Sequence, residues 1–332
     1  LFRRSIVNNP LRVSSAGASD VGRRRKHNED VILVREDLSL WSVTDGAGGH
    51  NAGEVAAALA ARSISNYMGA TVRKAWDQPI YDPFGIPNGG RRLAAAIRKA
   101  NKDVLEVARH QNKYQNMVCT AVAAALCHRS MLMHVAHVGD SRCYRLRSCQ
   151  LEQLTLDHSL LIEVLEREPD LDNTIVARMP RNVVTRALGI EDNVRVTFRS
   201  FPMLPGDRYL LCSDGLSGMV DHPTIEAALT EPSSPKEAVD RLIALANENG
   251  GKDNISVIVI DVDADVDLVG WQAPLATTKP ETLDSDIPEI QVLGTDESDT
   301  VGQRLSLIES FPPDLIEPIG ELFKKNKDDQ DD

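Results

Sequence analysis

Carboxylates that stand directly beside apolar, β-type segments constrain this chain more than any other feature. The segments at residues 40–44 and 209–212 each run straight into an Asp-Gly pair. One Asp-Gly after a strand usually forms only a turn, because both residues accept turn conformations. Its repetition indicates that several carboxylates emerge at sheet ends. The four acidic groups are Asn28-Glu29-Asp30, Thr44-Asp45-Gly46, Ser213-Asp214-Gly215 and Lys252-Asp253-Asn254.

Carboxylates that converge in this way would repel one another and would need cations in order to coexist. Sites made only of oxygen ligands suit Mg²⁺ or Mn²⁺, whereas zinc prefers His or Cys, which these groups lack. Two such ions about 3.5 to 4 Å apart can hold the oxygens of an in-line displacement at phosphorus. The pattern therefore favours hydrolysis of a phosphate ester, although spacing alone leaves the convergence open.

Hydrophobic periodicity predicts an α+β fold with a layered β core. The apolar strand candidates come in adjacent sets with few helices between them, which favours antiparallel sheets with helices packed outside. We expect strands at residues 31–34, 40–44, 121–126, 132–138, 209–212 and 255–262, and helices at 53–68, 91–110 and 236–247. His134 and His137 differ by an odd step on one strand, so we expect them on opposite faces as packing residues.

Composition divides the chain into three parts. Residues 14–263 contain the recurring apolar segments of a globular domain, and residues 1–13 form an N-terminal extension. Residues 264–332 are acidic and poor in apolar side chains, so we expect a disordered tail. Within that tail, residues 311–323 carry apolar side chains that could dock on a partner or on the domain. Pro318 and Gly320 weaken any helix there, which favours an untethered tail.

Charge and cysteine content exclude several classes of protein. The net charge of −12 over 332 residues disfavours binding to DNA or RNA. Five cysteines without a Cys-x-x-Cys pair indicate reduced thiols and a cytoplasmic protein. No apolar run approaches the ~20 residues that a membrane span needs, and the first residues lack a signal peptide's apolar stretch. The chain starts at Leu1, which fits a fragment or a processed product, and we expect a monomer.

Several dispersed motifs follow one another along the chain. They are Gly22 with Arg25, Asn28-Glu29-Asp30, Val43-Thr44-Asp45-Gly46-Ala47-Gly48-Gly49-His50, Val138-Gly139-Asp140-Ser141-Arg142, Asp157-His158-Ser159, Arg186-Ala187-Leu188-Gly189, Leu211-Cys212-Ser213-Asp214-Gly215 and Gly251-Lys252-Asp253-Asn254-Ile255-Ser256. Their order resembles the PPM, or type 2C, protein phosphatases, and the bacterial branch most of all. The resemblance covers about residues 14–262, and it is far more specific than any one motif.

The resemblance implies a four-layer αββα sandwich and a phosphatase that acts on phosphoserine and phosphothreonine. A hydroxide bridging two Mn²⁺ or Mg²⁺ ions would attack phosphorus directly, without a covalent phosphoenzyme. In this scheme Asp45 bridges the ions, Gly46 and Glu29 complete one shell, and Asp214 and Asp253 hold the other ion.

The resemblance also assigns roles around these ligands. Asp30 would order metal-bound water, and Asp140 would share a third, weaker ion with Asp214. Arg25 would bind the substrate phosphate with its planar fork. Its basic neighbours Arg23, Arg24 and Lys26 are interpreted as solvated surface.

Two further parts of the family pattern are the general acid and a flap. Eukaryotic relatives often have a histidine general acid where this chain has Ala47, and His50 does not match that position, so the general acid is unassigned. Residues 160–182 resemble a flap beside the active site that influences substrate choice, and their own sequence indicates only a polar, movable segment.

Two other functions compete with catalysis. A non-catalytic module would bind phosphorylated partners or a kinase, but such family members usually lose metal aspartates that this chain keeps. A calcium-binding protein is disfavoured because no DxDxDG loop occurs. As substrates of a phosphatase we expect Ser/Thr kinases or their phosphorylated targets in bacterial signalling.

Overall fold

The computed structural model describes residues 11–48, 52–180 and 182–264. Within this part, residues 11–157 and 186–264 form one compact unit, and residues 158–185 belong to a second. Residues 265–332 of the predicted tail, the first ten residues and His50 lie outside the described residues, whereas residue 264 ends the last strand. In the described part of the chain, no helix is long and apolar enough to cross a bilayer.

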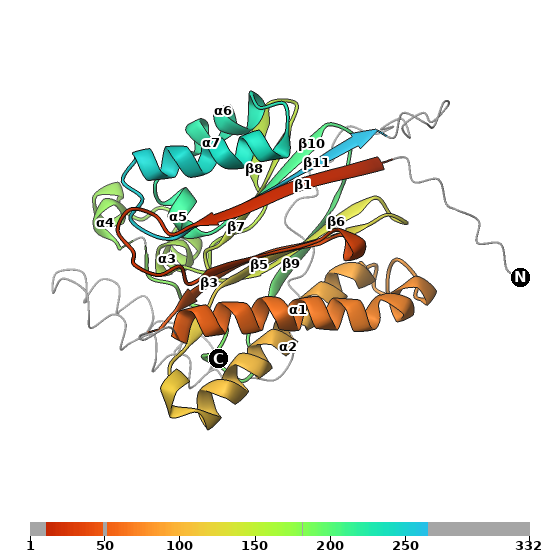
Figure 1. Ribbon diagram of the computed structural model, residues 1–332, viewed down its shortest axis with the longest axis horizontal. Coiled ribbons are helices and arrows are strands. Elements are labelled where there is room, and N and C mark those ends of the chain that lie inside the picture. Colours follow the sequence, from red (N-terminus) through yellow and green to blue (C-terminus); the bar gives the residue numbers. More distant parts are fainter. Residues whose placement is uncertain (1–10, 49–51, 181, 265–332) are drawn as a thin grey trace, which may run out of the picture. The chain divides into compact units, whose positions relative to one another are not determined.

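Two antiparallel sheets form the centre of the larger unit (Figure 1). The first sheet has the order β1 (Leu11–Asp20), β11 (Ile255–Ala264), β10 (Asp207–Cys212), β7 (Arg142–Arg147) and β8 (Gln150–Gln153). The second has the order β2 (Asp30–Arg35), β3 (Leu40–Ala47), β5 (Ala121–Cys127), β6 (Leu132–Val138) and β9 (Thr197–Pro202), and β4 (Val118–Cys119) pairs with β3.

Helices cover the outer face of each sheet. The long helices α1 (Ala52–Asp77) and α2 (Asn88–His110) pack on the second sheet, and α6 (His222–Thr230) and α7 (Pro235–Glu248) pack on the first (Figure 1). One apolar core lies between the two sheets and one lies under each helical layer. The layers are therefore helix, sheet, sheet and helix, which confirms the predicted αββα arrangement.

Shorter elements complete the chain. A short helix, α5 (Asp214–Ser217), follows β10, and the 3-10 turns η1 (Glu36–Leu38) and η2 (Asn112–Tyr114) lie in connections. The smaller unit contains α3 (Leu160–Arg167) and α4 (Asn173–Arg178). Sequence reasoning missed these two helices in the segment predicted to be a polar flap. The buried Leu160 and Val164 on α3 show that its apolar residues supply a helical face there.

Each predicted strand and helix is present, and several are longer than predicted. β1 was missed because its sequence, LRVSSAGASD, is rich in small and polar residues. It is defined by continuous pairing with β11 from Leu11 to Asp20, which includes residues 11–13 of the predicted extension. β3 continues through Ala47, so Asp45 and Gly46 lie inside the strand. The Asp-Gly pattern had instead indicated a turn after the strand. The short strand β4 supplies the partner that prolongs the ladder there.

His134 and His137 face opposite sides of β6, as predicted from their odd spacing. His134 Nδ1 lies 2.7 Å from Ser200 Oγ, and its ring lies next to Gly89 of α2. His137 Nε2 lies 2.7 Å from the carbonyl oxygen of Leu156. Both side chains are buried, so each ring is a packing residue with a polar partner.

Helix α1 approaches β3 so closely that only glycine fits at the contact. A Cβ on Gly46 would lie 2.0 Å from the carbonyl oxygen of Gly53 and 2.8 Å from that of Glu29. Both obstacles are backbone atoms, which cannot move aside as the end of a flexible side chain can. The contact fixes the start of α1 against the strand that carries Asp45.

The buried ring of His134 should make stability depend on pH. Burial, and then the charge of Arg92, lower its pKa from 6.5 to about 4. The folded protein therefore keeps the ring neutral, and this contribution to stability is present above pH 6.5 and is lost as the pH falls toward 4. Its full size is on the order of 3 kcal/mol. In urea titrations from pH 7.5 to 4.5, His134→Gln should lose less stability than the wild type.

The exposed His110 at the end of α2 provides the control for this experiment. His110→Gln should follow the wild-type dependence on pH. Parallel curves for the wild type and His134→Gln would show that the buried ring does not contribute to acid sensitivity.

A methyl group at Gly46 should disrupt the contact between α1 and β3. We expect Gly46→Ala to lower the free energy of unfolding by more than about 2 kcal/mol, since backbone atoms must shift. Gly69→Ala in α1 is the matched control, because its Cβ would meet only Leu38 Cδ1 at 3.7 Å. That change should stabilise the protein by about 0.5 to 1 kcal/mol through helix propensity. Equal urea midpoints for Gly46→Ala and the wild type would contradict the steric argument.

Candidate metal centre

The predicted acidic residues lie at one shared edge of the two sheets, by which we mean the side where the ends of the strands meet. In the second sheet, β2 begins and β3 ends at this edge, and β6 ends there too. In the first sheet, β10 ends and β11 begins at the matching edge. The connections from β1 to β2 and from β6 to β7 pass between the sheets at this point, so residues far apart in sequence converge.

Asp30 and Asp45 are direct partners across β2 and β3. Like charges in directly opposed positions destabilise a sheet unless another group compensates them. Burial, and then the charges of Asp30 and Asp214, raise the pKa of Asp45 well above its ordinary value. Burial also raises the pKa of Asp30 to about 7. The ionised form of both carboxyl groups is therefore disfavoured at this place.

The first sheet adds two more carboxylates to this pair. Asp214 begins α5 immediately after β10, and Asp253 precedes β11. Burial, and then the charge of Asp253, raise the pKa of Asp214. The structure therefore brings together the residues predicted to hold the second ion.

Asp140 joins the same group from the connection between β6 and β7. It is buried, and burial followed by the charge of Asp214 raises its pKa to about 7. Gly139 before it has φ of +104°, and a Cβ there would lie 2.6 Å from Thr120. The left-handed glycine thus turns the chain so that Asp140 faces Asp214.

Glu29 and Arg25 lie in the connection between β1 and β2. The carbonyl oxygen of Glu29 accepts a hydrogen bond of 3.2 Å from the Gly46 amide, which holds the Glu29 backbone beside the end of β3. Burial raises the pKa of the Glu29 carboxyl group. Arg25 Nη2 donates a hydrogen bond of 2.8 Å to Asp253 Oδ2. The predicted phosphate-binding residue therefore lies within reach of the carboxylate cluster.

Two polar residues that received no role from the sequence hold this cluster in place. Ser213 Oγ donates a hydrogen bond of 2.8 Å to Asp30 Oδ2 and so links the two sheets. Asn254 Oδ1 accepts from the Glu29 amide at 2.9 Å, and its Nδ2 donates to the carbonyl oxygens of Val21 and His27. Both are buried. The sequence signal that could have identified them is their position, directly before Asp214 and directly after Asp253.

The donor set fits hard divalent cations. All its side chains are carboxylates, and in the described part of the chain Asp30 Oδ1 and Asp214 Oδ1 are buried without a hydrogen-bond partner. Among the described residues, no group of three or more His, Cys, Asp or Glu side chains is arranged so that it could hold a metal ion by itself. Mg²⁺ is commonly held by one or two carboxylates with water in the other positions. An open carboxylate cluster of this kind is consistent with such a site.

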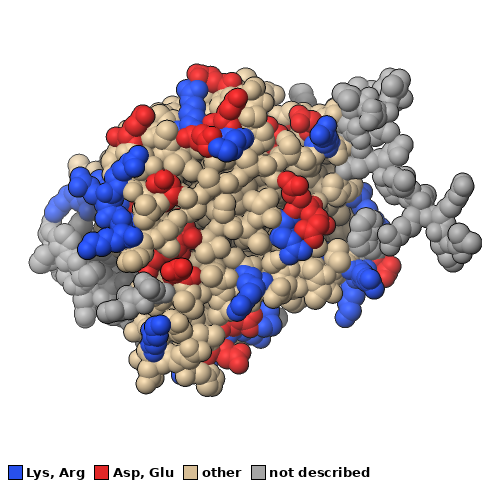
Figure 2. Space-filling model, viewed as in Figure 1, with Lys and Arg blue, Asp and Glu red and all other residues tan. Residues whose placement is uncertain are grey.

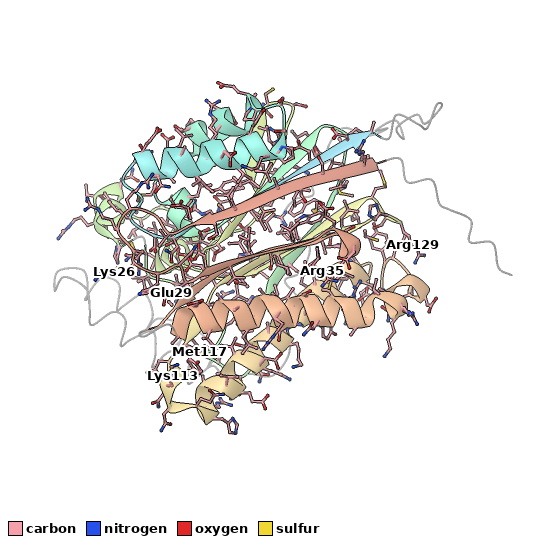
Figure 3. The ribbon with its side chains drawn as sticks, in the orientation of Figure 1. Lys26, Glu29, Arg35, Lys113, Met117 and Arg129 are labelled. Carbon is pink, nitrogen blue, oxygen red and sulfur yellow. The ribbon has the colours of Figure 1, made fainter. Side chains whose placement is uncertain are left out.

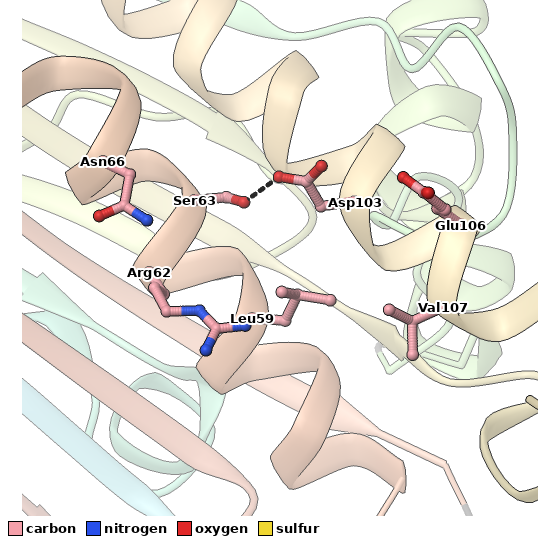
Figure 4. Close-up of a pocket in the computed structure, with 7 residues that line it drawn as sticks. All are labelled: Leu59, Arg62, Ser63, Asn66, Asp103, Glu106 and Val107. Carbon is pink, nitrogen blue, oxygen red and sulfur yellow. Dashed lines mark hydrogen bonds between the residues drawn. The ribbon is translucent and has the colours of Figure 1, made fainter. Parts of the chain in front are cut away.

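The two described cavities of the helical face lie away from this cluster. One of about 440 Å³ lies between α1 and α2, where Ser63 donates a hydrogen bond to Asp103 (Figure 4). A second of about 410 Å³ shares Leu59, Arg62 and Val107 with it. Neither contains a predicted site residue. The candidate centre is therefore identified by converging charge and not by an enclosed cavity.

Ala47 stands exposed at the end of β3, at the position of the histidine in eukaryotic relatives. Its methyl group cannot donate a proton. The structure thus places no general acid at this position.

Comparisons with known proteins identify relatives of this chain. A sequence model described as protein phosphatase 2C matches residues 21–256. The serine/threonine phosphatase stp of Listeria monocytogenes is 35% identical over 249 residues, which cover 74% of this chain and 94% of that protein. The serine/threonine protein phosphatase PstP of Mycobacterium tuberculosis is 31% identical over 299 residues, which cover 90% of this chain and 54% of that protein.

Solved structures give the same result. The crystal structure of the Mycobacterium tuberculosis phosphatase PstP/Ppp has a TM-score of 0.65 and 31% identity, with 76% of this chain and 99% of that chain covered. The catalytic domain of PstP in complex with two manganese ions has a TM-score of 0.62 and 34% identity, with the same coverage. The motif order, the layered fold and these relatives together show that the chain belongs to the protein phosphatase 2C family.

Proposed function

We propose that this protein is a metal-dependent protein serine/threonine phosphatase. The observation that carries the proposal is the convergence of Asp30, Asp45, Asp140, Asp214 and Asp253 at the shared edge of two sheets. Five carboxylates in one place repel one another unless protons or cations neutralise some of them, and bound cations leave all five ionised. The family relation supports the same activity, since the named relatives are serine/threonine phosphatases.

The proposed ligands form two main sets with one shared member. Asp45 would contact two ions, with the Gly46 carbonyl oxygen and Glu29 on one side and Asp214 and Asp253 on the other. Mn²⁺ or Mg²⁺ suits these oxygen donors, and the manganese complex of the related PstP catalytic domain supports the choice. When bound, the ions would lower the pKa of water and so would supply a nucleophile for direct hydrolysis of the phosphate ester.

Asp140 is the proposed residue for a third, weaker ion. The electrostatic effect of Asp214 on its carboxyl group supports this role, because two neighbouring carboxylates can share one cation. Because Asp140 directly follows the turn at Gly139, the backbone sets its position relative to Asp214. A weaker ion fits a set that contains fewer protein ligands.

Arg25 is the proposed phosphate-binding residue. Its guanidinium group donates to Asp253, so a phosphate that binds here would compete with that carboxylate for the same donors. The planar group can donate to two phosphate oxygens at once. Arg25 would thereby orient the phosphoryl group over the carboxylate cluster.

Asp30 has a positioning role in this proposal. Ser213 donates to its Oδ2 atom, and its buried Oδ1 atom, which has no hydrogen-bond partner among the described residues, could accept from water. Residues behind the ligands fix ligand geometry, and their loss typically costs about 10- to 100-fold in affinity or activity. The leaving serine or threonine oxygen requires a proton from a group other than residue 47.

The cellular role follows from the substrate class. Phosphorylated proteins, among them Ser/Thr kinases and the targets of those kinases, are the proposed substrates. The enzyme would then oppose Ser/Thr kinases in bacterial signalling as a cytoplasmic monomer. Residues 264–332 are proposed as a tail outside the catalytic domain that can bind a partner.

Removal of one ligand tests the proposal. The wild type should release phosphate from an aryl phosphate and a phosphothreonine peptide with Mn²⁺ or Mg²⁺ and should be inactive with EDTA. Asp214→Asn should lower kcat by at least about 100-fold, because losing a direct ligand should cost at least as much as losing a residue behind it. Titration calorimetry with Mn²⁺ should show weaker binding to the variant.

Asp240→Asn is the matched control, since Asp240 is an exposed carboxylate on α7 that pairs with Lys236. It should keep wild-type turnover and Mn²⁺ affinity. A folded wild type that hydrolyses neither substrate with any divalent metal would refute catalysis and favour a phosphoprotein-binding module.

A further inference from the structure

The turn between β1 and β2 concentrates positive charge beside an acidic centre. Arg23, Arg24 and Lys26 flank Arg25 and are exposed, and the exposed Lys252 precedes Asp253 in the neighbouring loop. The chain as a whole has a net charge of −12, so this grouping departs from the average surface. We call Arg23, Arg24, Lys26 and Lys252 the basic rim. Figure 3 labels Lys26 and Glu29 together at this end of the molecule, and Figure 2 shows Lys and Arg gathered over the same edge.

The backbone beneath the basic rim is held by several contacts. The Arg23 amide donates a hydrogen bond of 2.7 Å to the carbonyl oxygen of Gly251, and the stem of Arg23 packs against that glycine. Asn254 Nδ2 binds the turn at Val21 and His27, on either side of the basic residues. Gly22 has φ of +79°, and a Cβ there would lie 2.2 Å from the carbonyl oxygen of Asp253. The rim therefore has a fixed position relative to Arg25 and Asp253.

Among the described residues, no carboxylate neutralises the charges of the basic rim through an ion pair. None of its four side chains forms an ion pair with another residue in the described part of the chain. Other arginines of the same domain are paired, such as Arg147 with Asp207 and Arg208 with Asp261. Four cations without an ion-pair partner in the described part of the chain, beside the proposed phosphate-binding residue Arg25, form a surface that complements negative charge.

We propose that the basic rim selects phosphoproteins whose phosphoserine or phosphothreonine is flanked by Asp and Glu residues. The proposal rests on the proposed phosphatase function and adds the substrate class. Residues of an extended peptide are about 3.3 to 3.6 Å apart, so side chains two to four positions from the phosphoresidue can reach the rim when Arg25 binds the phosphate. The rim residues touch the flanks of the substrate and take no part in the chemistry.

Exposed charge pairs have modest and salt-dependent effects. Each contact with a flanking carboxylate should change kcat/KM by about two- to five-fold. The effect should appear mainly in KM, because the contacts are the same in the ground state and the transition state. It should also weaken at high salt, since the screening length falls to about 8 Å at physiological ionic strength.

Reversal of two rim charges tests the proposal. The substrates are a phosphothreonine peptide with Asp and Glu at positions two and three on either side, the same peptide with Asn and Gln there, and a small aryl phosphate. The wild type should prefer the acidic peptide by about 5- to 20-fold in kcat/KM at low salt. The double variant Arg24→Glu/Lys26→Glu should lose or invert this preference and keep its turnover of the aryl phosphate within about two-fold.

Arg73→Glu/Lys74→Glu is the matched control, because it reverses the same two residue types at exposed positions near the C-terminal end of α1. It should retain the wild-type preference. A preference that is equal in the wild type and in the rim variant would overturn the proposal. An equal loss on all three substrates would overturn it too, because the turn would then act on the centre itself.

A binding measurement separates this proposal from the phosphatase proposal. The fluorescently labelled acidic peptide should bind Asp214→Asn protein more tightly than the neutral peptide does, and the rim variant in the same background should remove the difference. If no substrate is hydrolysed but this difference in affinity is present, the phosphatase proposal is refuted and the proposal for the basic rim is supported. Equal affinities for the two peptides in the Asp214→Asn protein would refute the rim.

Discussion

Repulsion between Asp30 and Asp45, which face each other across two hydrogen-bonded strands, is the constraint on which this site depends. A sheet places directly opposed side chains about 4.5 to 5.5 Å apart, so neither carboxylate can move away without breaking the ladder. Asp214 and Asp140 increase the negative charge at the same place. The rest of the fold at this edge either delivers these carboxylates or holds them there.

Holding them requires polar contacts that join segments distant in sequence. Ser213 bonds to Asp30 across 183 positions of the chain, and Asn254 fixes Glu29 across 225. Glycines complete the arrangement, because Gly46 and Gly215 approach backbone atoms so closely that no side chain fits. The Cβ of residue 215 would lie 1.9 Å from the Asn254 carbonyl oxygen, which explains the glycine directly after Asp214. Backbone packing thus fixes the positions of the carboxylates, and the carboxylates remain available for cations.

The same connection that bears Glu29 and Asp30 also bears Arg25 and the basic rim. Opposite charges therefore alternate within a few residues, and the backbone separates them. Burial brings Asp30 inside, whereas Arg23, Arg24 and Lys26 stay in solvent. One connection thus links the two sheets, contributes to the carboxylate cluster and presents a basic surface to solvent. Because Asn254 binds this connection at several points, its shape does not depend on the charged side chains.

The sequence by itself determined the elements whose signals are local. Apolar β-branched runs predicted the inner strands, helical periodicity predicted α1, α2 and α7, and the order of the acidic motifs predicted the family and the residues of the centre. Local signals failed for β1, whose small and polar residues become a strand only through pairing with β11. They also failed for the end of β3, since the partner strand β4 lies more than 70 positions away.

Only the tertiary structure decided which residues meet. Hydrogen bonds such as Ser213 with Asp30 and Asn254 with Glu29 depend on how two sheets align, and no local pattern encodes that alignment. The same holds for the charge environment. A basic run in sequence is indistinguishable from ordinary solvated surface, because ion pairing is a property of three-dimensional neighbours. The sequence therefore specified the chemistry available to this protein, and the packing of its two sheets specified where that chemistry is assembled.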